Sequence, residues 1–130
     1  MKPFALSFTA APTDIDELGH VNNAVWVAWV QRLSVGHWEA VAPAEHQAAH
    51  VWVVTRHEID YRGNVGEGET VVGKTWVSGQ PKGARFDRQF RFTGTDGRVR
   101  VEGQSTWALL DRATGRLLRI RPDFAAPFLD

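Results

Sequence analysis

The chain has 130 residues and no cysteine, and its 15 lysines and arginines balance its 15 aspartates and glutamates. This length suits a single domain, residues 1–130, which buries roughly two-thirds of the surface that the unfolded chain exposes. Without cysteine there is no disulfide, no thiol nucleophile and no cysteine-ligated metal. Zero net charge and the lack of any block of like charge speak against nucleic-acid and membrane partners, and favour a small-molecule ligand.

The N-terminal segment alternates between apolar and smaller or polar side chains, so we expect a first strand at residues 4–10. Ser7 and Thr9 interrupt the apolar run, which argues against a signal peptide. No run of the sequence is long and apolar enough to span a membrane, and there is no cysteine framework. The sequence therefore predicts a cytoplasmic location.

A polar turn, TDIDELGHVNN at residues 13–23, leads directly into the apolar run at residues 24–30. Asn22 or Asn23 is a natural N-cap, because its side-chain oxygen can accept a hydrogen bond from a free N–H group of the first helical turn. We expect a helix from about Asn23 to Val41. Since its first turns are apolar on every side, we expect the rest of the chain to wrap around it.

Four further strands follow a polar connector at residues 43–50, which has room for a short helical turn. Their expected ranges are Val51–Tyr61, Glu69–Ser78, Ala84–Thr93 and Val99–Asp111. The last three are separated by turn residues and should form a meander. We expect a short extension at residues 116–120 and a loose C-terminal turn at residues 122–129.

One strand, one long helix and four more strands offer too few crossovers for a doubly wound sheet, and too much helix for a sandwich. The sequence therefore predicts an α+β fold in which an antiparallel sheet curls around one helix. The N-terminus of that helix meets a loop with two carboxylates, Asp14 and Asp16. This places a partial positive charge and unpaired N–H donors beside a candidate base, an arrangement suited to acyl chemistry.

Two motifs carry a resemblance to a known family: D-x-D-x-x-G-H-V-N-N at Asp14–Asn23, and R-H-E-I-D-Y-R at Arg56–Arg62. Together with the element order they resemble the hotdog-fold acyl-CoA thioesterases, most of all the 4-hydroxybenzoyl-CoA thioesterase-like branch. The likeness extends from residue 4 to about residue 120. It implies a hotdog fold, an antiparallel sheet of five strands or slightly more wrapped around one long central helix.

The resemblance also implies roles in the polar turn. In that family the carboxylate that matches Asp16 is catalytic, as a nucleophile or as a general base on water. The backbone N–H at the start of the helix, here that of Asn23, polarises the thioester carbonyl, and the partner subunit completes the site. His20 is a candidate for orienting Asp16 or the substrate, with a scaffold role as the alternative. Asn22 is a candidate substrate contact as well as a cap.

A single carboxylate is sufficient for this chemistry. A thiol leaving group has a pKa near about 8.5, so the enzyme must supply mainly an activated attacker and stabilisation of the developing oxyanion. The alternative is that Asp14 and Asp16 only cap a turn and complement the helix dipole. The sequence also departs from related branches, because Leu18, Asn23 and Asn64 stand where those branches carry additional catalytic groups. Asp16 is therefore nearly the only side chain of the motif that could act in catalysis.

Three cations around the GQPKGAR turn, Lys82, Arg85 and Arg88, are candidates for pairing with the phosphates of coenzyme A. The alternative is a solvated hairpin. The six tryptophans are enough to build an aromatic acyl pocket, although we favour core and subunit-interface packing for most of them. They are Trp26, Trp29, Trp38, Trp52, Trp76 and Trp107.

We expect neither a metal nor a cofactor. The Asp14–Gly19 segment begins like a calcium loop, but Leu18 and Val25 occupy positions that require oxygen ligands. His46 and His50 have the i, i+4 spacing of a zinc clamp, but Gln47 stands where the zinc-protease motif carries its glutamate.

Two functions remain open at this stage. The first is an acyl-CoA thioesterase for a small or medium, possibly aromatic, acyl group. The second is a non-catalytic hotdog module that binds an acyl ligand or serves in assembly. A curled sheet leaves an exposed edge strand and a half-open pocket, so we expect a homodimer or homotetramer with a shared site. The sequence does not specify the acyl group, or whether the carrier is coenzyme A or an acyl-carrier protein.

Overall fold

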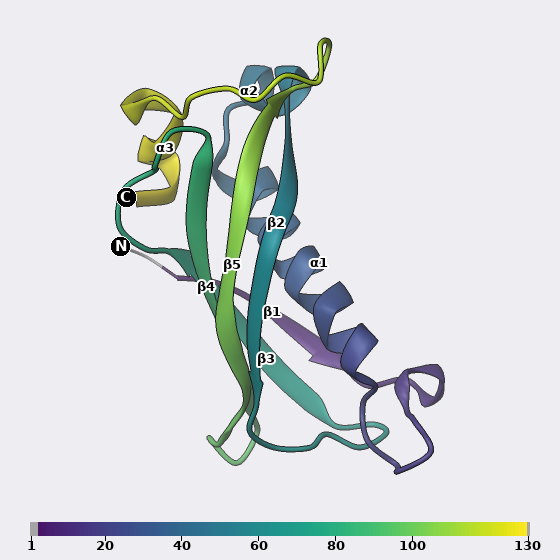
Figure 1. Cartoon of the computed structure of the whole chain (residues 1–130). Helices are drawn as coiled ribbons and strands as arrows, with labels where there is room; N and C mark the ends of the chain where they lie inside the picture. The colour runs from purple at the N-terminus through teal and green to yellow at the C-terminus, as the bar shows by residue number, and fades with distance from the viewer. Residues whose placement is uncertain (1–2, 130) are drawn as a thin grey trace.

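The computed structural model describes residues 3–129 of the chain. Its elements are, in order, β1 (Phe4–Thr9), the 3₁₀ turn η1 (Pro12–Asp14), α1 (Asn23–Val41), α2 (Ala44–Ala49), β2 (His50–Tyr61), β3 (Thr70–Val77), β4 (Arg85–Gly94), β5 (Val99–Asp111) and α3 (Pro122–Leu129). Figure 1 shows a long twisted sheet with α1 crossing one face, and with α2 and α3 near one end. The predicted α+β class, with five strands and one long helix, is confirmed.

The five strands form one antiparallel sheet in the order β1-β3-β4-β5-β2. Strands β3, β4 and β5 are neighbours in space as they are in sequence, so the predicted meander is confirmed. Each predicted strand end lies within one residue of the observed end. The alternation of apolar and polar residues therefore located the strands well, because a half-buried strand places every second side chain in the core.

Helix α1 begins and ends where the sequence predicts, and Asn22 is its N-cap. The helix remains unbroken at Gly36, although glycine is a poor helix former. A Cβ atom at Gly36 would lie 3.1 Å from a ring atom of Phe4 and 3.2 Å from a methyl carbon of Leu6. Glycine at this position therefore allows α1 to pack closely against β1.

The expectation that α1 is buried on every side is wrong for a single chain. The helix packs mainly on β1 and β3, and its buried residues lie on one face: Trp26, Trp29, Val30, Leu33, Ser34 and His37. Ala24 and Ala28 are exposed, and Val27 is half-buried. The apolar run therefore covers the core with one face and leaves part of the other face exposed in the single chain. None of the helices in residues 3–129 is long and apolar enough to cross a membrane.

The C-terminal segment is the helix α3 and not a loose turn, which corrects the prediction. Pro122 begins the helix and Pro127 lies inside it, and these two prolines made the segment look like a loop. Phe124 and Phe128 are buried in a second core cluster beside the C-terminal half of α1, where Trp38 and Trp52 pack against them. This cluster fills one end of the molecule with aromatic rings.

Strand β2 lies at an edge of the sheet, paired with β5 on one side only. It is long, His50–Tyr61, with a register shift between Val54 and Arg56. Val53 and Tyr61 are 39% and 45% exposed, which is high for large apolar side chains. A long, exposed and partly apolar edge is a surface on which another strand can add.

Candidate active site

The polar turn forms a closed loop immediately before α1. The Asp16 N–H donates to the His20 carbonyl at 2.8 Å, and Gly19, with φ of 81°, supplies the left-handed residue that the loop needs. The Val21 N–H donates to the Val65 carbonyl at 2.8 Å. The loop is thereby fixed to the segment that follows β2, and the Asp16 side chain has a defined position.

The two carboxylate oxygens of Asp16 have different surroundings. Oδ1 accepts hydrogen bonds from the Leu18 N–H at 2.9 Å and from the His20 N–H at 3.2 Å, as in an Asx turn. Oδ2 has no hydrogen-bond partner among residues 3–129. One oxygen therefore holds the turn, while the other is available to a substrate or a water molecule.

The helix N-terminus offers a donor next to this turn. The Asn22 side chain accepts from the Ala24 N–H at 2.9 Å, and so satisfies one of the free groups of the first turn. The Asn23 N–H donates to no acceptor in the described part of the chain. The predicted cap and the proposed oxyanion donor are thus adjacent residues, and the helix dipole adds partial positive charge there.

His20 and Asp14 support the loop in different ways. His20 contacts Asp16 through its backbone N–H and carbonyl, while its half-buried ring makes no hydrogen bond within residues 3–129. Asp14 accepts from the Ala11 N–H at 2.8 Å, and its carbonyl accepts from the Asn22 N–H at 2.9 Å. The Asp14 carboxylate is therefore committed to a local cap, unlike Oδ2 of Asp16.

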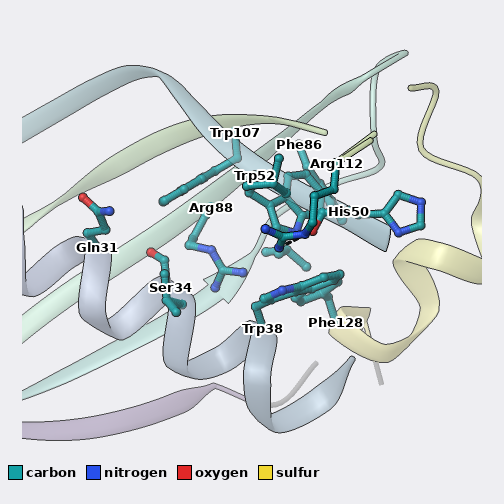
Figure 2. A pocket seen from close by; sticks show the side chains of 13 residues that line it. Gln31, Ser34, Trp38, His50, Trp52, Phe86, Arg88, Trp107, Arg112 and Phe128 are labelled. Carbon is teal, nitrogen blue, oxygen red and sulfur yellow. Dashed lines mark hydrogen bonds between the residues drawn. The ribbon is translucent and has the colours of Figure 1, made fainter. Parts of the chain in front are cut away.

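A cavity of about 290 Å³ lies between the C-terminal half of α1 and the sheet (Figure 2). Five elements, α1, β2, β4, β5 and α3, contribute aromatic rings to its wall, and two arginines also line it. The lining residues are Gln31, Ser34, Val35, Trp38, His50, Val51, Trp52, Val77, Phe86, Arg88, Trp107, Arg112 and Phe128. Three of the six tryptophans, Trp38, Trp52 and Trp107, line this cavity, while Trp26 and Trp29 are core residues.

The cavity lies away from Asp16 within one chain. None of residues 13–23 lines it. The first α1 residue in its wall is Gln31, eight residues after Asn23, which corresponds to about 12 Å along the helix axis. A single chain thus carries a candidate catalytic group and a candidate acyl pocket at separate places.

Arg88 is the most unusual residue of the cavity, because its side chain is charged and only 6% exposed. Its Nη1 donates to His37 Nδ1 at 2.8 Å and to Thr75 Oγ1 at 3.0 Å. The guanidinium also lies over the Phe128 ring, 5.7 Å from its centroid. No carboxylate in the described residues forms an ion pair with Arg88.

His37 is held neutral by these surroundings. Burial, and then the positive charge of Arg88, lower the pKa of His37 from 6.5 to about 4. Burial also lowers the pKa of Arg88 to about 10, so its guanidinium remains charged at neutral pH. Since His37 Nδ1 accepts from Arg88, the ring proton is on Nε2. The pair therefore carries one positive charge.

The structure separates Arg88 from Lys82 and Arg85, with which the sequence analysis grouped it. Lys82 and Arg85 are exposed and pair through their backbones at the hairpin between β3 and β4. Arg88 lies on the inner face of β4 with Phe86 and Phe90. Arg88 is therefore not part of the exposed cationic surface of Lys82 and Arg85, because its buried side chain lies at the cavity.

The histidines and carboxylates of the described residues are not clustered as metal ligands. No group of three or more histidine, aspartate or glutamate side chains within residues 3–129 is arranged to hold a metal ion. His46 and His50 lie with ring centroids 6.0 Å apart, and His50 Nδ1 is 2.8 Å from the His46 carbonyl oxygen. Both rings pack against Phe124.

A sequence signal for the buried arginine was present. In RFDRQFRF, strand periodicity places Phe86, Arg88, Phe90 and Phe92 on one face, and three phenylalanines mark that face as the core. The cavity itself had no such signal, because separate elements contribute its wall.

Comparison with known families places this fold and site in context. The family model described as the thioesterase-like superfamily matches residues 10–128. The chain therefore belongs to the thioesterase-like superfamily, and the predicted class of enzyme, a thioester hydrolase, is confirmed at that level. No protein of curated function matches the sequence.

Solved structures confirm the hotdog fold. The chain is similar to a Lactobacillus plantarum protein named provisionally as an oleoyl thioesterase, with 20% identity and a TM-score of 0.87 over 98% of this chain and 51% of that one. It thus spans about half of that protein. It is also similar to a 1,4-dihydroxy-2-naphthoyl-CoA thioesterase from Synechocystis, with 10% identity and a TM-score of 0.83 over 99% and 97%. A third is a Thermus thermophilus thioesterase complexed with coenzyme A and zinc, with 21% identity and a TM-score of 0.82 over 95% and 90%.

The lowered pKa of His37 predicts a loss of stability in mild acid. As the pH falls below 6.5 the unfolded chain takes up a proton at His37, whereas the folded chain does so only near pH 4. The free energy of unfolding should therefore decrease by about 2 kcal/mol between pH 7.5 and pH 5 from this residue. Urea denaturation at both pH values measures the change.

A His37→Gln variant is the matched control, because glutamine can accept from Arg88 but does not titrate. Its unfolding free energy should change less with pH than that of the parent. A residual slope from His57, whose pKa burial also lowers, is expected in both proteins. An equal pH dependence in parent and variant would contradict the assignment.

Proposed function

We propose that the chain hydrolyses an acyl-CoA thioester of small or medium size, with Asp16 as the catalytic residue. The observation that carries this proposal is that, within residues 3–129, Oδ2 of Asp16 accepts no hydrogen bond and the Asn23 N–H at the N-terminus of α1 donates none. A thioester needs both an attacker and an oxyanion donor, and this turn provides one of each.

The reaction follows from these two groups. Asp16 attacks the thioester carbon itself, or takes a proton from a water molecule that attacks it. The carbonyl oxygen becomes an oxyanion and accepts from the Asn23 N–H. The C–S bond then breaks, the thiolate of coenzyme A leaves and is protonated, and water supplies the oxygen of the carboxylic acid. If Asp16 attacks, water releases the acid from the anhydride in a second step.

We further propose that two chains share each site through β2. The cavity lies at the His50 end of β2, while the Asp16 loop is fixed to Val65, just beyond the Tyr61 end. Antiparallel pairing of two β2 edges about a two-fold axis would bring the start of one strand beside the end of the other. The cavity of one chain would then meet Asp16 of its partner. The exposed Ala24 and Ala28 face would also gain a neighbour.

Coenzyme A is the carrier we favour over an acyl-carrier protein, because a similar Staphylococcus aureus protein and a similar Thermus thermophilus thioesterase were each solved in complex with it. Lys82 and Arg85 are exposed at the hairpin before β4, near the start of the strand that carries Arg88. They remain candidates for its phosphates. The cytoplasmic location expected from the sequence remains a prediction.

A non-catalytic acyl-binding or assembly module is the second candidate. One observation favours it: within a single chain, the cavity is lined by Trp38, Trp52 and Trp107 and does not include Asp16. A binding module would need the cavity but not the free carboxylate oxygen. Hydrolysis of an acyl-CoA that depends on Asp16 therefore separates the two candidates.

Replacing Asp16 by asparagine should abolish most activity without unfolding the protein. Asparagine keeps an oxygen that can accept from the Leu18 and His20 N–H groups, but it lacks the charge needed for attack or proton transfer. The rate of acyl-CoA hydrolysis should fall by roughly 10²- to 10⁴-fold, the range typical of a lost general base. A thiol reagent that detects free coenzyme A measures the rate.

Asp14→Asn is the matched control in the same loop, because the Asp14 carboxylate is engaged with the Ala11 N–H. It should retain most of the parent's activity. Thermal denaturation of both variants reports on folding. Parent-like hydrolysis by Asp16→Asn, in a folded protein, would assign Asp16 a purely structural role.

Replacing Lys82 and Arg85 together by alanine should raise KM and leave kcat nearly unchanged. Contacts to distant phosphates stabilise the bound substrate and the transition state alike. Two exposed charges are worth roughly a 3- to 10-fold change in KM. Arg98→Ala, in the hairpin at the other end of β4, is the control. An unchanged KM would show that Lys82 and Arg85 do not bind the phosphates and are only solvated residues of the hairpin.

A further inference from the structure

The cavity has the shape and lining of a site for a flat ring. Trp38 and Phe128 stack with an interplanar angle of 9°, and Trp52 crosses Trp38 at 88°, so flat faces and edges bound the space. Its volume of about 290 Å³ is roughly twice that of an apolar cavity known to hold benzene. A substituted aromatic ring would fit.

The guanidinium of Arg88 extends into this aromatic space (Figure 2). Its two hydrogen bonds to protein, to His37 and Thr75, both come from Nη1. An arginine has five N–H donors, so the Nε and Nη2 donors have no acceptor among residues 3–129. The fully buried side-chain nitrogen and oxygen atoms that lack a partner do not include Nε or Nη2 of Arg88. These two atoms are therefore not fully buried, and the cavity reaches them.

The fold gains little from this charge. A buried ion loses several kcal/mol of solvation, and apolar replacements of buried ions are often neutral or stabilising. The neighbouring inner positions of β4 carry Phe86 and Phe90, which shows what the core accepts there. A buried cation that lacks a carboxylate partner and faces a cavity is a candidate ligand-binding group.

The free donors also indicate the kind of ligand. Nε and Nη2 form a planar fork that matches the two oxygens of a carboxylate, or binds a single anionic oxygen. Arg112, at the same cavity, donates instead to the His50 carbonyl at 3.1 Å and is exposed. Of the two arginines in the described cavity wall, Arg88 alone reaches the interior, which suits one anionic oxygen group better than a polyphosphate.

We propose that this cavity selects an aromatic acyl group with an anionic oxygen on the side of the ring opposite the thioester, and that Arg88 binds that oxygen. This inference rests on the proposed function, since the ring enters as the acyl part of a thioester. It goes beyond that function by naming the substrate class and the residue that determines it. Arg88 is a specificity residue and takes no part in bond breaking.

The test compares two thioesters of coenzyme A that differ in one group. The acyl groups are 4-carboxybenzoyl and 4-methylbenzoyl, which have similar shapes, but only the first has a distal carboxylate. The parent should prefer the carboxylate in kcat/KM. In Arg88→Met the ratio of the two kcat/KM values should fall by roughly 10- to 100-fold, as expected for a lost charge-assisted hydrogen bond.

Arg91→Met is the matched control, because Arg91 lies on the same strand but faces away from the core and pairs with Glu102. It should keep the parent's ratio. Arg88→Lys retains the charge but loses the fork, so its ratio should lie between those of the parent and Arg88→Met. Thermal denaturation should show that Arg88→Met remains folded, although His37 and Thr75 lose the hydrogen bonds that Arg88 donates. If Arg88→Met fails to fold, Arg88→Lys decides.

A binding measurement separates this inference from the proposed function. Calorimetry with the free acids terephthalate and 4-methylbenzoate requires no hydrolysis, and terephthalate should bind more tightly to the parent than to Arg88→Met. Such binding without hydrolysis of any thioester would refute the proposed enzymatic function, but it would still support the binding site at Arg88. Hydrolysis that depends on Asp16, with the same carboxylate preference in the parent and the Arg88 variants, would overturn the inference and leave the enzyme intact.

Discussion

Strand β2 pairs with the sheet on one side only, and this constraint determines where a complete site can form. The chain places the Asp16 loop beyond one end of the strand and the aromatic cavity beside the other end. No rearrangement within one chain joins them, because the strand is extended and fixed to β5 along its length. In the dimer that we propose, antiparallel pairing of two such edges would bring these parts together without altering either fold.

The loop before α1 shows that a structural role and a chemical role are compatible. Oδ1 of Asp16 closes the turn, and Oδ2 remains free. The same division applies at the helix, where Asn22 caps the N–H of Ala24 and leaves that of Asn23 unpaired. Arg88 extends this pattern to the cavity, where Nη1 is held by the protein and the other donors face the ligand space.

Local patterns made much of the fold predictable from the sequence. The Asn22 cap and the apolar run located α1, and strand alternation located the sheet to within a residue. The helix α3 was missed because Pro122 and Pro127 resemble loop residues, although both are tolerated in a helix packed on aromatic rings. The cavity was not predictable, because its wall joins residues from α1, four strands and α3. Arg88 was grouped with Lys82 and Arg85 because they are close in sequence, although the alternation of Phe86, Arg88 and Phe90 already placed it on the inner face of the strand.

The most direct test of a shared site is a mixed dimer of two inactive variants. One chain carries Asp16→Asn, and the other carries Val35→Trp, which fills the mouth of the cavity at an exposed position. If Asp16 serves the cavity of its partner, one of the two sites in the mixed dimer is intact, and about half of the parent's activity should return. A mixed dimer that is as inactive as each of the two variants alone would contradict the account. A protein that remains monomeric would also contradict it.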